Sequence, residues 1–250
     1  MADHHAGRGR ARARVGSERE VTSQLDAVGQ DRRFQAASIL DTVTAAELDP
    51  NGPVPALKEW AVVVRALLAG EQILDLRKGG IREEGRHFGL RSTRVWLYPT
   101  VEHQERDLVR PAYRRWIDDS EQDAPADRAI RVEGWADIVG VAKLTDPEAL
   151  AKIDGKFIWT GDYAASRLQW KQRDPLWVLA LRAYRLAEPV VVPFRDEYGG
   201  CTSWVDLDGL PADPASVASE PALSDGAFEA RLGFAANDLP DGFEEPVVQA

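Results

Sequence analysis

The sequence IRVEGWADIVGVAKL, residues 130–144, is the strongest indication of the fold. Its β-branched and aromatic residues are typical of a long strand, and Gly134 and Gly140 predict bends or bulges within it. A second strand-like run, PLWVLALRAYRLAEPVVV, spans residues 175–192 and is interrupted at Pro189. Strands of this length are long enough to curl, so we expect a small mixed barrel.

Shorter elements are expected around these two strands. Residues 55–70 begin with a proline, have apolar side chains at helical spacing and end in glycine, which predicts a helix. Strands are predicted at residues 72–77, 94–98 and 202–207, helices at 100–116, 146–153 and 163–170, and a polar linker at 118–128. Together these elements predict an α+β fold, a mixed β-barrel with peripheral helices.

The 250-residue chain is expected to contain one globular domain between two polar ends. Residues 1–53 lack sustained apolar periodicity and end in the breaker sequence Asn-Gly-Pro, so we expect a mostly disordered or short-helical segment there. The barrel domain is expected at residues 54–208. Residues 209–250 are rich in Pro, Ala, Ser and Asp, which predicts a largely disordered acidic tail.

The net charge of −10 is unevenly distributed. Residues 206–250 contain ten acidic residues and one basic residue, whereas residues 56–115 contain twelve basic and eight acidic residues. The acidic total therefore does not exclude an anionic ligand, and the tail is a candidate nucleic-acid mimic that covers a basic cleft. Because the single cysteine, Cys201, excludes an internal disulfide and no long apolar stretch predicts a membrane span, we expect a cytoplasmic protein without membrane partners.

Several motifs carry a resemblance that covers about 150 residues. They are ALKEW at residues 56–60, LRKGGI at 76–81, LYPT at 97–100, HQ at 103–104, FIWT at 157–160, LRAYRL at 181–186 and YGGC with SWV between 198 and 205. In this order they resemble the family described as domain of unknown function 1802 (DUF1802). This resemblance implies a common fold but names no activity.

A weaker resemblance involves the run GEQILDLR from Gly70 to Arg77. It is similar to the G-x-K-x-x-E-x-R signature of the ASCH branch of PUA-like barrels. That resemblance implies binding of RNA or modified nucleobases, and hydrolysis of modified nucleosides in some members. Here Gln72 replaces the signature lysine and Asp75 replaces the glutamate, so the match favours binding over hydrolysis.

Five residues are the candidate ligand-binding set: Arg77, Lys78, Tyr98, His103 and Gln104. The two cations precede a Gly-Gly turn, where backbone N–H groups and positive charge suit a phosphate. Tyr98 ends a predicted strand and is a candidate for stacking on a base, and His103 and Gln104 follow that strand. The leading hypothesis is therefore binding of RNA or a nucleotide in a partly basic cleft.

Two other functional classes stay open. A nucleoside-processing hydrolase or a metal-dependent nuclease would use Asp75, Glu102 and His103. The third class is a protein-interaction module. The sequence indicates no cofactor and no set of metal ligands, and it leaves open whether the protein is an enzyme.

Overall fold

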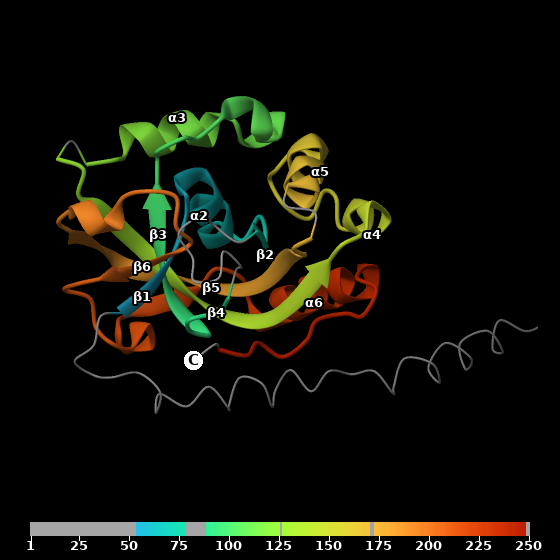
Figure 1. Ribbon diagram of the computed structural model, residues 1–250. Helices are drawn as coiled ribbons and strands as arrows, with labels where there is room; N and C mark the ends of the chain where they lie inside the picture. The colour runs from blue at the N-terminus through green and yellow to red at the C-terminus, as the bar shows by residue number, and fades with distance from the viewer. Residues whose placement is uncertain (1–53, 79–88, 126, 171–172, 249–250) are drawn as a thin grey trace, which may run out of the picture. The chain divides into compact units, whose positions relative to one another are not determined.

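The computed structural model describes residues 54–78, 89–125, 127–170 and 173–248, all of which belong to one of the chain's two compact units, Ile39–Ala250. The predicted N-terminal segment, residues 1–53, lies outside the described residues. One mixed sheet of seven strands organises this unit (Figure 1). Its strands are β1 (Val54–Trp60), β2 (Leu74–Arg77), β3 (Arg94–Thr100), β4 (Ile130–Leu144), β5 (Leu176–Val192), β6 (Trp204–Leu207) and β7 (Ser219–Pro221).

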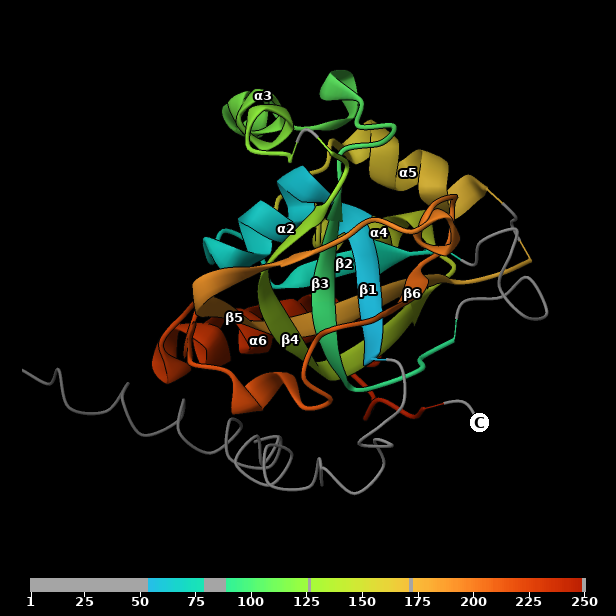
Figure 2. The same ribbon diagram turned by 90° about the vertical axis from the view of Figure 1, so that its left-hand side faces the viewer.

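The strand order is β2-β5-β4-β3-β1-β6, and β7 adds to β5 outside this path. The pair β1–β3 is parallel and the other pairs are antiparallel. Figure 2 shows β3 and β1 side by side in front of the long β4 and β5. Successive residues of β3 enter two different apolar clusters, with Val95 and Leu97 in one and Trp96 and Tyr98 in the other, so both faces of the sheet are covered.

The two long strands confirm the strongest sequence prediction. β4 occupies residues 130–144 as expected, and its pairing with β5 shifts register between Val132 and Gly134 and between Ile138 and Gly140. Steric crowding explains why residue 134 is glycine, because a Cβ at this position would lie 2.4 Å from the Tyr184 carbonyl oxygen. The bulges allow these strands to bend around the core.

The α+β class is confirmed, but the predicted barrel does not close. β2 and β6 are the two edges of the sheet, and no backbone pairing joins them in the described residues. Each of these strands has only four residues. A side chain bridges the opening instead, because Arg77 on β2 donates from Nη1 to the Lys58 carbonyl on β1 at 2.9 Å.

The helices are α2 (Ala61–Leu68), α3 (Arg115–Gln122), α4 (Pro147–Lys152), α5 (Gly161–Gln169) and α6 (Asp225–Asp238). Seven of the eight residues of α2 are buried, and α2 lies against the sheet with α3 beyond it (Figure 1). The segment 161–169 confirms the helix predicted near residue 163. Among the described helices, none combines the length and apolarity needed to span a bilayer.

Two helix predictions were wrong in part. Residues 55–60 form β1 rather than the first turns of a helix, because their backbone pairs with both β3 and β6. Residues 100–116 contain a turn and the short 3-10 helices Arg106–Leu108 and Pro111–Tyr113 before α3 begins. α3 also replaces the first part of the predicted linker 118–128.

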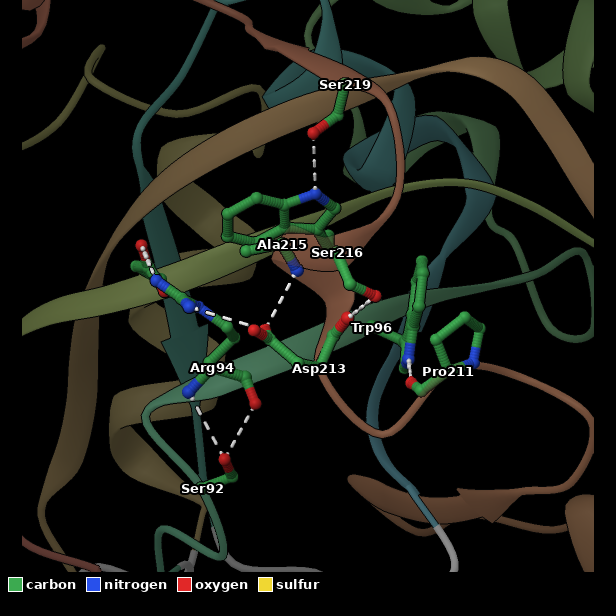
Figure 3. Close-up of polar contacts among 10 residues, drawn as sticks. Ser92, Arg94, Trp96, Pro211, Asp213, Ala215, Ser216 and Ser219 are labelled. Carbon is green, nitrogen blue, oxygen red and sulfur yellow. Dashed lines mark hydrogen bonds and ion pairs between the residues drawn. The ribbon is translucent and has the colours of Figure 1, made fainter. Parts of the chain in front are cut away.

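The C-terminal segment is folded, which corrects the expectation of a largely disordered tail. Phe228 and Phe243 are buried in the main apolar cluster, and β7 pairs with β5. Figure 3 shows how the segment before β7 is fixed: the Trp96 indole donates to the Pro211 carbonyl at 3.3 Å, and Asp213 lies 3.4 Å from Arg94. Apolar anchors far apart in the sequence hold this segment, so a periodicity search does not detect it.

Candidate functional site

A cavity of about 200 Å³ lies where the end of β3 approaches α2 and α3. Aromatic and apolar side chains form part of its wall, including those of Tyr98 and Phe194. The charged residues that line it are Arg65, Arg128, Arg131, Glu102, Asp123 and Glu133. Arginines and carboxylates are thus equally represented, in contrast to the basic cleft that the sequence suggested.

Each of the three arginines pairs with a carboxylate of the same cavity. Arg65 Nη1 lies 3.3 Å from Asp123 Oδ2, and Arg131 Nε lies 2.8 Å from Glu133 Oε1. Arg128 Nη2 lies 3.3 Å from Glu102 Oε1. These side chains are 39–68% exposed, and exposed ion pairs contribute only about 0–1 kcal/mol each. A ligand can therefore replace a carboxylate at low cost.

Arg128 combines charge with an aromatic surface. Its guanidinium carbon lies 3.9 Å from the centroid of the Phe194 ring, within the range of a cation–π contact. Arg128 and His103 are, within the described ranges, the only residues other than glycine with positive φ, both at 63°. His103 is exposed and follows Glu102 directly, so the strained backbone is concentrated beside this cavity.

Tyr98 and a lysine that sequence reasoning missed lie together on the same side of the sheet as the cavity. Lys58 Nζ donates to the carbonyls of Tyr198 and Gly200, both at 3.0 Å, and lies 5.1 Å from the Tyr98 ring centroid. Burial lowers the pKa of Lys58 and raises that of Tyr98 to about 12. Lys58 was missed because its segment was predicted to be helical. The parallel pairing of β1 with β3 places it opposite Tyr98.

Arg77 lies away from the cavity, in a buried group that we call the Glu59 cluster: Glu59, Asp75 and Arg77. Arg77 Nε lies 2.7 Å from Asp75 Oδ2, and Nη2 lies 2.9 Å from Glu59 Oε2. Burial is the largest influence on Glu59 and raises its pKa to about 7, against the opposing attraction of Arg77. Asp75 is fully buried, so this carboxylate and the guanidinium are committed to contacts within the protein.

Two further residues of the candidate ligand-binding set, Lys78 and Gln104, form hydrogen bonds within the protein. Lys78 is buried and donates from Nζ to the Leu168 carbonyl at 2.8 Å, near the end of α5. Gln104 Oε1 accepts from the Val62 backbone N–H at 3.0 Å, which satisfies a donor in the first turn of α2. Of the five predicted residues, only Tyr98 lines the cavity.

The residues of the hydrolase hypothesis are also separated. Asp75 contacts Arg77 in the Glu59 cluster, whereas Glu102 pairs with Arg128 at the cavity. Gln72, at the position of the signature lysine, is buried and uses both ends of its amide, donating to the Leu74 carbonyl and accepting from the Ile158 N–H. Throughout the described part of the chain, no group of three or more His, Cys, Asp and Glu side chains could hold a metal ion.

Comparison with known proteins places the chain in the family suggested by its motifs. The family model described as a domain of unknown function (DUF1802) matches residues 56–233. No curated protein matches the sequence. A crystal structure of a mutant of ZmASCH from Zymomonas mobilis is similar with 14% sequence identity and a TM-score of 0.36, covering 64% of this chain and 92% of that one. Its name includes ASCH, the group whose signature resembles residues 70–77 of this chain. A similarity of this size implies no activity.

Proposed function

This chain belongs to the DUF1802 family, and we propose that it binds a nucleotide, or one nucleotide of an RNA strand, in the cavity beside Arg128. One observation carries the proposal. A cavity of about 200 Å³ combines the half-buried Phe194 ring with three arginines, each of which pairs with an exposed carboxylate of the same cavity. Ring faces bind bases by stacking, and guanidinium groups bind phosphate through paired hydrogen bonds.

Arg128 is the residue on which this binding depends most. In the free protein its guanidinium covers the Phe194 ring and pairs with Glu102. A phosphate can take the place of the Glu102 carboxylate, since an exposed ion pair of this kind is weak. The released Glu102 then becomes an acceptor for an amino group of a base.

The size of the cavity limits the ligand. Sites for drug-sized molecules are roughly 300–1,000 Å³, so this cavity of about 200 Å³ suits one ring-sized group and not a folded RNA. Single-stranded RNA presents its bases in this way, because unstacked bases can be inserted one at a time. We therefore expect binding of mononucleotides and single strands, with little affinity for duplexes.

Binding is best tested with the full chain and a short labelled single-stranded RNA. Fluorescence anisotropy should show an affinity that falls about tenfold in Arg128→Ala, equivalent to about 1.4 kcal/mol. Affinity should also fall as salt is raised from about 50 to 200 mM, because phosphate contacts release counterions. Calorimetry with nucleoside monophosphates then separates recognition of one nucleotide from recognition of a strand.

Arg106→Ala is the matched control. Arg106 is an exposed arginine paired with Asp118, and it does not line the cavity. Equal losses in the two variants would mean that the RNA is held by general surface charge, and the proposed site would be wrong. Absence of binding at about 50 mM salt would contradict the proposal as a whole.

A further inference from the structure

Unsatisfied polar atoms gather around the Glu59 cluster. In the part of the chain that the structure describes, four buried side-chain nitrogen or oxygen atoms have no hydrogen-bond partner, and three of them belong to Asp75, Arg77 and Arg167. The Arg77 atom is Nη2, which is close to Glu59 but outside hydrogen-bond geometry. Buried groups are normally satisfied, so this concentration requires an explanation.

Charge balance gives the first part of that explanation. Glu59 and Asp75 are two carboxylates on either side of one guanidinium, and the side chains of all three are no more than 13% exposed. If both carboxylates are ionised, the cluster has a net charge of −1 in a poorly solvated place, which is costly. The balance is restored either by a proton or by a second cation.

The second cation is Arg167, which lies on α5. Arg167 lies close enough to Glu59 to favour its ionised form, together with Arg77, whereas Asp75 opposes it. The other facing groups are the Tyr163 ring on α5 and the Trp60 backbone N–H, which donates to Glu59 Oε1 at 2.7 Å. In the structure the Arg167 guanidinium lies over Trp170, with its central carbon 5.0 Å from the centroid of the Trp170 ring.

We propose that Glu59 and Arg167 form a proton-controlled switch between β1 and α5. When Glu59 holds a proton, the cluster with Arg77 and Asp75 is neutral and Arg167 stays on the Trp170 ring. When Glu59 loses that proton to water, Arg167 turns away from Trp170, and its unsatisfied Nε–H becomes a donor to the carboxylate. The switch thus links the position of a side chain at the end of α5 to the pH.

The direction and range follow from the environment of Glu59. Burial raises its pKa from 4.5 to about 7, so the group binds a proton below neutral pH and releases it above. In the unfolded chain the same carboxyl releases its proton near its ordinary pKa of 4.5. The folded chain therefore holds the extra proton between these two values, and the Arg167 movement is expected at the upper one.

Tryptophan fluorescence of the full chain measures this movement. The signal of Trp170, obtained as the difference between the natural chain and Trp170→Phe, should change with a midpoint near pH 7. Glu59→Gln removes the proton-binding group and should abolish the change. His103→Gln is the control, because His103 is exposed and lies outside the Glu59 cluster, and this substitution should leave the midpoint unchanged.

Two outcomes would overturn the switch. One is a Trp170 signal that does not change between about pH 5.5 and 8.5, the range in which a group with this pKa titrates. The other is a transition that persists in Glu59→Gln. If that variant does not fold, Arg167→Met provides the same test, since it removes the moving cation and should also abolish the change in the Trp170 signal.

Discussion

The cavity and the Glu59 cluster both pair arginine with carboxylate, but they differ in access to water. The Arg128 and Glu102 side chains are 61% and 42% exposed, whereas those of Arg77 and Asp75 are 8% and 0% exposed. Exposed pairs are weak and exchangeable, and buried pairs are costly to break because an uncompensated charge remains. The same residue types therefore form exchangeable pairs in one region and structural pairs in the other.

One strand separates the two regions. Lys58 and Glu59 are neighbours on β1, and successive side chains of a strand point to opposite faces. Lys58 lies by Tyr98 in the direction of the cavity, and Glu59 pairs with Arg77 on the other side. The two faces of β1 can thus be perturbed separately by substitutions at adjacent positions.

Arg77→Met should have the largest effect on stability. It removes the cation between two buried carboxylates and its bond to the Lys58 carbonyl, the side-chain link across the open side of the sheet. We expect a loss of about 3–5 kcal/mol in the free energy of unfolding, measured with urea. Arg106→Met, at an exposed pair, is the control and should cost less than about 1 kcal/mol. Similar values for both would show that burial does not distinguish the two kinds of pair.

Local features of the chain could be predicted from the sequence, whereas contacts between distant residues could not. The composition of β4 and its two glycines predict a bulged strand, because those requirements are local. Whether Arg77 is free or paired depends on Glu59, which is brought from another strand across the sheet opening. A contact between residues on different strands leaves no periodic pattern in the sequence. Arg77 was therefore interpreted as a cation available to a ligand.

Lys58→Met should have an intermediate effect. The substitution keeps the apolar stem but removes the ammonium group, which donates to the Tyr198 and Gly200 carbonyls. One buried and one partly buried acceptor lose their partner, and we expect a loss of about 1–3 kcal/mol in unfolding free energy. The pH midpoint of Trp170 fluorescence should stay unchanged, because that readout reports the opposite face of β1. A shifted midpoint would mean that the two faces are coupled.

The sequence predicted a residue of the cavity only where the position of that residue follows from its own strand. Tyr98 was named because it ends the expected strand 94–98, and β3, which continues to Thr100, leads into the cavity. Arg128 and Phe194 are 66 positions apart and meet only in the fold, with Arg128 in a segment whose polar composition predicted a linker. The folded C-terminal segment was missed for the same reason, since Phe228 and Phe243 bury against distant residues.

Arg128→Ala should have the smallest effect on stability while having a clear effect on binding. Its ion pair with Glu102 is exposed, so urea unfolding should show a change of less than about 1 kcal/mol. Arg128→Gly adds a sharper comparison. Glycine adopts the positive φ of this position without strain, and it should therefore be at least as stable as the alanine variant. Both variants should lose RNA affinity equally. If the alanine variant instead lost as much stability as Arg77→Met, the cavity arginine would be structural, and an exchange of Glu102 for phosphate would no longer be tenable.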